Sequence, residues 1–96
     1  MADKTYGPDS IFEKSGEVIV RVIEGETVLL DLNSGIYYSL DDVGGRIWEL
    51  IDGEKSLSLI VGTVADEYDV APAQALEDAV ELLADLAGEG LARTKD

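Results

Sequence analysis

Apolar residues recur at every second position along segment 18–40, a spacing that places them on one face of a β-strand. We predict three strands, over Val18–Ile23, Thr27–Leu32 and Ile36–Leu40, because each is rich in β-branched, Leu or Tyr side chains. The even-numbered residues of all three strands are apolar. This shared parity predicts an antiparallel three-stranded meander with one buried face.

Short turns separate the predicted strands. Glu24-Gly25 lies between the first two strands, and Asn33-Ser34-Gly35 lies between the second and the third. The second of these is a strong turn signal because Asn and Gly both tolerate a positive φ angle.

The apolar spacing becomes helical after the third strand. Asp41 or Asp42 can cap a first helix that ends at Asp52-Gly53. Ser56 can cap a second helix that continues to Tyr68.

Pro72 suits the first turn of a third helix, which Gly88 or Gly90 would end. Its apolar positions are Leu76, Ala79, Val80, Leu83 and Leu86.

Inside the first helix, Gly44-Gly45 costs helix propensity, on the order of 1 kcal/mol for each residue relative to Ala. This pair indicates close backbone packing, against the sheet or another helix.

The predicted element order is βββααα, an α+β fold with helices on one face of the sheet. A chain of 96 residues and 10.3 kDa is expected to form one domain. We expect residues 1–16 to form a mobile or loosely packed arm, residues 17–92 the domain, and residues 93–96 a C-terminal tail. One more short strand within Leu91–Lys95 is the alternative to an irregular tail.

The composition restricts the available chemistry. The chain contains no Cys and no His, which excludes thiolate catalysis and nucleophilic catalysis by a Ser–His or Cys–His pair. Carboxylate pairs such as Asp41/Asp42 are interpreted as helix caps, and Asp66/Glu67 as a solvated helix face. We therefore expect a binding or adaptor protein with no catalytic residues, no cofactor and no metal.

The charge argues against nucleic acid and membrane partners. Lys and Arg number 7 against 21 Asp and Glu, which gives a net charge of −14. The third helix would be the DNA-reading helix of a winged helix-turn-helix, yet it contains no Lys or Arg. No apolar run approaches the roughly 20 residues of a membrane span, and no signal peptide is recognisable, so a cytoplasmic protein is expected.

The third predicted strand, Ile36–Leu40, would be an edge of the meander. It contains neither Lys nor Pro, the residues that commonly prevent edge pairing. Such an edge can accept an extended peptide as an additional strand. Coverage by the N-terminal arm and dimerisation through the edge are the alternatives.

Several runs of residues are distinctive in combination. They are Thr27–Leu32 (TVLLDL), Gly35–Leu40 (GIYYSL), Val43–Leu50 (VGGRIWEL), Asp52-Gly53, Tyr68-Asp69-Val70, and the spacing of Asp78, Leu82, Leu83, Leu86, Gly90 and Leu91. With these runs, about Val18–Leu91 of the chain resembles the PqqD-like family. In this sequence Asp41 stands where the family usually has Asn, and Ala79 and Leu82 are smaller than the family's usual residues.

The resemblance implies a function. Members of the PqqD-like family are small peptide chaperones, also called recognition elements of ribosomally synthesised and post-translationally modified peptides (RiPPs). Their fold is similar to a winged helix-turn-helix, with a three-stranded sheet and three helices. A leader peptide adds as a strand to their third β-strand and rests against their third helix.

By this resemblance, the chain is expected to be a stand-alone adaptor that binds the leader of a precursor peptide. It would present the precursor to a modifying enzyme, either a lasso-peptide protease or a radical SAM enzyme. A monomer is favoured. The alternative is a small acidic structural or regulatory module that forms a homodimer through its sheet edge.

The expected peptide-binding residues lie on the third strand and the third helix. They are Ile36, Tyr37, Tyr38, Ser39, Leu40, Leu76, Asp78, Ala79, Val80, Glu81, Leu83 and Asp85. Residues expected to form the walls of the groove are Tyr37, Ser39, Leu76, Ala79, Val80 and Leu83. The acids Asp78, Glu81 and Asp85 would form a rim that attracts Lys or Arg of the leader, whereas Tyr38, Leu40 and Trp48 are also expected to contact the core.

Overall fold

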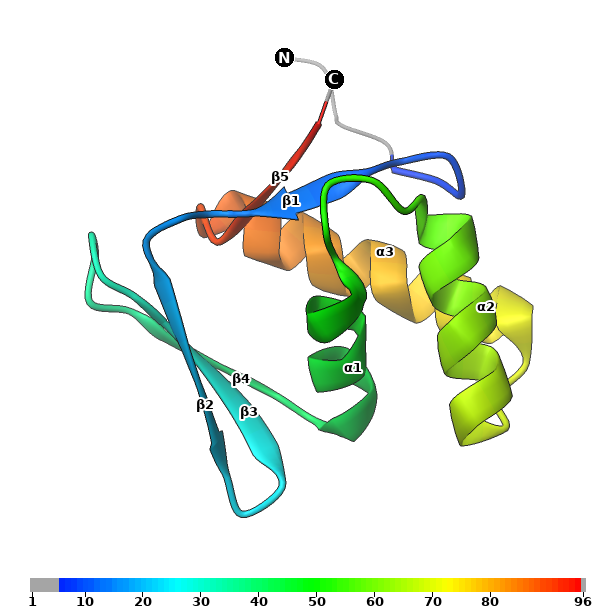
Figure 1. Cartoon of the computed structure of the whole chain (residues 1–96), viewed down its shortest axis with the longest axis horizontal. Coiled ribbons are helices and arrows are strands. Elements are labelled where there is room, and N and C mark those ends of the chain that lie inside the picture. Colours follow the sequence, from blue (N-terminus) through cyan, green and yellow to red (C-terminus); the bar gives the residue numbers. More distant parts are fainter. Residues whose placement is uncertain (1–5, 96) are drawn as a thin grey trace.

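The computed structural model describes residues 6–95, which form an α+β domain with five strands and three helices (Figure 1). In chain order the elements are β1 (Phe12–Lys14), β2 (Val18–Ile23), β3 (Glu26–Asp31), β4 (Tyr37–Leu40), α1 (Asp42–Leu50), α2 (Leu57–Tyr68), α3 (Pro72–Gly88) and β5 (Ala92–Thr94). The predicted strands and helices of segment 18–88 are all present. Among residues 6–95, no helix is both long enough and apolar enough to cross a bilayer.

The predicted meander is confirmed as an antiparallel sheet in the order β2-β3-β4. A two-residue turn connects β2 to β3, with positive φ angles at Glu24 (51°) and Gly25 (85°). In the second turn, the Asp31 carboxylate accepts hydrogen bonds from the Asn33 N–H and the Ser34 hydroxyl, each at 3.0 Å. Gly35 completes this turn with a φ of 76°.

The predicted face of the middle strand is wrong. Leu29 is fully buried, whereas Leu30 is half-buried and Leu32 is exposed. The two-residue turn pairs Ile23 with Glu26, so even-numbered residues of β2 lie beside odd-numbered residues of β3. The face that carries Leu29 therefore carries even-numbered residues on both neighbouring strands.

Part of the expected N-terminal arm belongs to the core. β1 pairs antiparallel with β5, and the Phe12 side chain is fully buried. The Tyr6 ring packs edge-on against Phe12, with 4.9 Å between ring centroids. A loosely packed arm is therefore wrong for residues 6–14, and residues 1–5 of the expected arm lie outside the described residues. The short strand considered within Leu91–Lys95 is present as β5.

The helices begin where the sequence predicts. Asp41 caps α1 by accepting the Gly44 N–H at 2.8 Å, Ser56 caps α2 and Pro72 occupies the first turn of α3.

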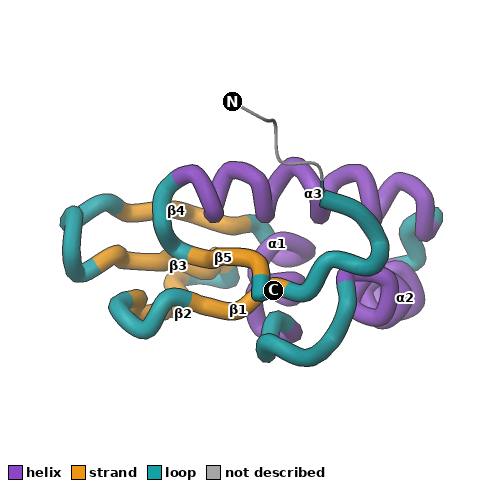
Figure 2. Tube along the Cα trace, turned by 90° about the horizontal axis from the view of Figure 1, so that it is seen from above, coloured by secondary structure: helices purple, strands orange, loops and turns teal. Residues whose placement is uncertain are grey.

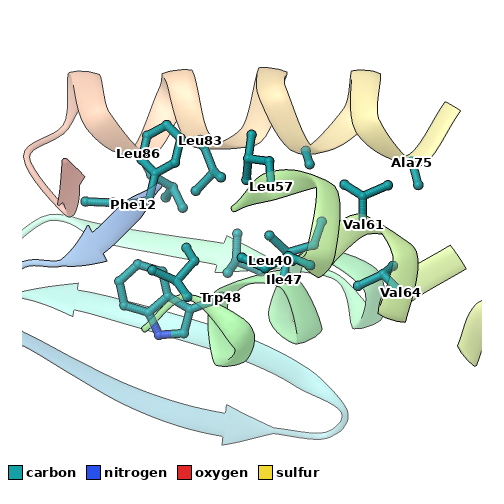
Figure 3. Close-up of a cluster of buried hydrophobic side chains, with 14 of the residues drawn as sticks. Phe12, Leu40, Ile47, Trp48, Leu57, Val61, Val64, Ala75, Leu83 and Leu86 are labelled. Carbon is teal, nitrogen blue, oxygen red and sulfur yellow. The ribbon is translucent and has the colours of Figure 1, made fainter. Parts of the chain in front are cut away.

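Figure 3 shows the core between α3, α1 and β1, in which Trp48 and Phe12 are the largest buried side chains.

The helix α1 packs closely on the sheet at Gly45. A Cβ atom at this position would collide with the Thr27 side chain of β3, with Thr27 Cβ only 3.1 Å away. The predicted close packing of Gly44-Gly45 is thus against the sheet. Any side chain at position 45 would force α1 and β3 apart.

We expect Gly45→Ala to lower the free energy of unfolding by about 1–3 kcal/mol, because overpacking outweighs the better helix propensity of Ala. Gly62→Ala is the matched control. Gly62 lies in α2, and a Cβ added there would have no atom within 4 Å, so this substitution should raise stability by up to ~1 kcal/mol. Urea denaturation of both variants checks the prediction, and equal stability of the two would contradict it.

Candidate functional site

The strand β4 has one paired edge and one open edge. Within residues 6–95 it pairs only with β3. The Asp31 N–H donates to the Ile36 carbonyl at 3.0 Å in the turn that continues this ladder. Hydrogen-bonded and non-bonded pairs alternate along an antiparallel ladder. The backbone groups of Tyr38 and Leu40 therefore face β3, and those of Tyr37 and Ser39 face away from it.

A cleft of about 590 Å³ lies along this open edge, between β4, α1 and α3. Figure 2 shows that β4 is the strand of the three-stranded sheet nearest to α3. The cleft is lined by Tyr38, Ser39, Leu40, Asp41, Val43, Gly44, Ile47, Val70, Ala75, Asp78, Glu81, Leu82 and Asp85.

The floor of the cleft is apolar, and its wall on α3 is acidic. Leu40 and Ile47 are buried beneath it. Gly44 lies between β4 and α3, since a Cβ there would be 3.4 Å from Leu40 Cβ and 3.5 Å from Leu82 Cδ2. The absence of a side chain at Gly44 keeps this part of the cleft open.

Asp78, Glu81 and Asp85 form the acidic wall. Their spacing of three and four residues places them on one face of α3. All three are exposed, and so are the Asp41 and Ser39 side chains on the opposite side of the cleft. The cleft therefore combines a negative rim with an apolar floor and an open strand edge.

A hydrogen bond joins the two sides of the cleft. The Tyr38 hydroxyl on β4 donates to Asp85 Oδ2 on α3 at 3.3 Å. Burial raises the pKa of Tyr38 above its ordinary value, and the charge and hydrogen bond of Asp85 and the charge of Glu89 raise this pKa further. The phenol is neutral at physiological pH and can act as the donor.

The structure brings together half of the predicted site residues. Those that line the cleft are Tyr38, Ser39, Leu40, Asp78, Glu81 and Asp85. Those that do not are Ile36, Tyr37, Leu76, Ala79, Val80 and Leu83. Tyr37 is 70% exposed and points to the opposite face of the sheet from Tyr38, so its side chain forms no wall of the cleft.

The predicted wall residues of the third helix lie on a neighbouring face of that helix, outside the lining of the cleft. Ala79 and Leu83 are fully buried in the core, and Leu76 and Val80 pack against it. Each residue step rotates about 100° around a helix. The cleft faces the adjoining row that contains Asp78, Leu82 and Asp85.

Sequence reasoning missed several residues of the cleft, namely Asp41, Val43, Gly44, Ile47, Val70, Ala75 and Leu82. Two signals could have found some of them. Leu82 shares the helical row of Asp78 and Asp85. A glycine within a helix indicates a position where a side chain is disfavoured, and at Gly44 the missing side chain leaves space for the cleft. Val70 belongs to the connection between α2 and α3, which no local pattern assigns to the cleft.

Another hollow of about 620 Å³ lies along α2 and the start of α3, between Ser58 and Pro72. It is shallow, and no strand borders it. The cleft beside β4 is therefore the better candidate for a peptide site.

Among residues 6–95, no group of three or more acidic side chains is placed to hold a metal ion.

The fold and the cleft define a small α+β domain with an open sheet edge beside a helix. The chain belongs to the PqqD family. Its residues 26–92 match the family described as coenzyme PQQ synthesis protein D. A comparison with curated protein sequences found no match.

Solved structures with the same fold support this assignment. TbiB1 in complex with the TbiA(beta) leader peptide is 34% identical, with a TM-score of 0.76 over 88% of this chain and 98% of that chain. Lasso peptide synthetase B1, complexed with its leader peptide, is 28% identical, with a TM-score of 0.75 over 85% of this chain and 96% of that chain.

A third similar structure is the PqqD truncation of Methylobacterium extorquens PqqCD, described as a functional and stand-alone RiPP recognition element. It is 27% identical, with a TM-score of 0.78 over 94% of this chain and 95% of that chain. The expected α+β architecture and family are confirmed by these matches.

We expect Asp85→Asn to lower the pKa of Tyr38, because it removes the neighbouring negative charge. The pKa should stay above the ordinary value, since burial is the largest cause of the shift. The stability that the neutral phenol contributes is present below pH ~10 and is lost as the pH rises through the raised pKa. NMR titration of ring-labelled Tyr checks this, with Asp66→Asn as the control. An unchanged pKa in Asp85→Asn would contradict the hydrogen bond.

Proposed function

We propose that this chain is a non-catalytic adaptor that binds the leader of a ribosomally made precursor peptide by β-strand addition to β4. The observation that supports this function best is the geometry of the β4 edge. The outward backbone groups of Tyr37 and Ser39 border a cleft of about 590 Å³ that has both a strand edge and a helical wall. An extended peptide can use both at once.

Backbone pairing would fix the register of the leader. Each hydrogen bond to the Tyr37 or Ser39 backbone would contribute roughly 0.5–1.5 kcal/mol net. Alternate side chains of an added strand point to the same face, so every second leader residue would enter the cleft above Leu40 and Gly44. These residues would supply the specificity.

The acidic wall predicts the charge of the leader. Asp78, Glu81 and Asp85 would attract a Lys or Arg placed beside the apolar residues of the leader. Because the acids are exposed, their effect would be mainly on the rate of association and on its salt dependence.

The bound precursor would then be presented to a modifying enzyme in the cytoplasm, where the ribosome releases it. The similarity to TbiB1 and to lasso peptide synthetase B1, both solved with leader peptides, favours a lasso-peptide protease as that enzyme. A radical SAM enzyme is the second candidate, supported by the resemblance to the PqqD family as a whole.

We expect Ser39→Pro to weaken leader binding by about tenfold or more, because proline removes an outward N–H and adds bulk at the edge. Ser39→Ala retains the N–H and should bind within about twofold of the wild type. Calorimetry with a synthetic leader from the precursor encoded in the same gene cluster measures both affinities.

Equal affinity of Ser39→Pro and Ser39→Ala, with both variants folded, would exclude strand addition at β4. Sedimentation of the wild type tests the alternative function. A dimer that Ser39→Pro converts to a monomer, without any leader binding, would show that the edge serves self-association.

We also expect the triple variant Asp78→Asn/Glu81→Gln/Asp85→Asn to slow leader association by about tenfold at low salt, with a smaller effect at high salt. A charge-matched control is Asp66→Asn/Asp69→Asn/Glu77→Gln, whose residues lie outside the cleft beside β4. Stopped-flow fluorescence measures the rates. Equal rates in the two triple variants would mean that net charge, rather than the acidic wall, governs association.

A further inference from the structure

The strand β2 has the sequence of a buried strand but lies at an exposed edge of the sheet. Its sequence, VIVRVI, is apolar on both faces, a pattern typical of strands that are covered on both sides. Yet Ile19, Val20, Val22 and Ile23 are 37%, 43%, 69% and 56% exposed. Within residues 6–95, β2 pairs only with β3.

The exposed apolar side chains lie on both faces of the hairpin. Val20 and Val22 share the face of the buried Leu29, because they pair with Leu29 and Thr27. Ile19 and Ile23 lie on the outer face of the sheet, away from the helices. The strand register places Ile19 beside Leu30, and Leu30 beside Tyr37. Figure 1 shows the hairpin of β2 and β3 extending from the body of the molecule. We call Ile19, Val20, Val22, Ile23, Leu30 and Tyr37 the hairpin surface. These side chains cover both faces of the free β2 edge and the outer face of β3 and β4, and a cluster of exposed apolar side chains of this kind is typical of an interaction site.

We propose that the hairpin surface docks a second protein that carries an apolar patch bordered by Lys or Arg. This inference rests on the proposed function, in which that protein is the modifying enzyme. The exposed acids Glu17, Glu24 and Glu26 lie at the two ends of the hairpin. A basic border on the partner would complement these charges.

The charge disfavours a second copy of the chain as the occupant. Each copy has a net charge of −14, and a symmetric contact between two hairpin surfaces would bring identical sets of acids together. The strand geometry also favours the modifying enzyme. Tyr37 contributes its side chain to the hairpin surface and its backbone to the leader-binding edge. An enzyme on the hairpin surface would therefore lie next to the bound leader.

The test uses the triple variant Ile19→Thr/Val22→Thr/Ile23→Thr, in which Thr retains the β-branched shape suited to a strand. The matched control is Leu59→Gln, which replaces an apolar side chain on α2 that is 62% exposed and outside the hairpin surface. Affinity is measured for the leader peptide and, separately, for the purified modifying enzyme encoded in the same gene cluster.

We expect the triple variant to bind the leader within about twofold of the wild type and the enzyme at least about tenfold more weakly. Leu59→Gln should bind both as the wild type does. Where the triple variant does not fold, Val22→Thr alone tests the most exposed β2 side chain. Glu24→Gln/Glu26→Gln should slow enzyme association and reduce its salt dependence.

Wild-type affinity for the enzyme in the triple variant would overturn the proposal. A wild-type dimer that the triple variant converts to a monomer, with enzyme affinity unchanged, would assign the surface to a second copy and also overturn it. Failure of the wild type to bind any leader would overturn the proposed function instead. The enzyme affinities, measured without leader, would still decide whether the hairpin surface docks the enzyme.

Discussion

The contact between Gly45 of α1 and Thr27 of β3 determines how the domain is assembled. With no side chain at position 45, α1 lies directly on the sheet. The next glycine, Gly44, then lies between Leu40 of β4 and Leu82 of α3, where it leaves space. The close packing of α1 on the sheet at Gly45 offsets part of the helix propensity that the two adjacent glycines cost, and Gly44 leaves the cleft open on the other side of α1.

The sequence predicts well those features that depend on neighbouring residues. Asp41, Ser56 and Pro72 mark the helix starts because capping involves groups within one turn. The pairing of β1 with β5 was missed, since it joins residues about eighty positions apart and neither strand exceeds three residues. The face of β3 was wrong because every residue from Val28 to Leu30 is apolar. Only the two-residue turn at Glu24-Gly25 fixes which of them is buried.

The candidate site was half predictable for a related reason. Apolar residues on α3 form the row Ala79, Leu83 and Leu86, and sequence periodicity identifies this row as a buried one. Periodicity cannot assign it to the core or to a ligand groove, since both bury apolar side chains. The acidic row beside it borders the cleft, so one face of α3 packs in the core and the adjacent face lines the cleft.

The pairing of β1 with β5 has a consequence for how such a domain can be built into larger proteins. It places the two ends of the described chain side by side, and neither strand contributes a residue to the cleft. Another polypeptide can therefore be fused at either end, or this domain inserted into a loop of a host protein, without obstructing β4. The M. extorquens relative, a PqqD segment of the longer PqqCD chain, has such a covalent linkage.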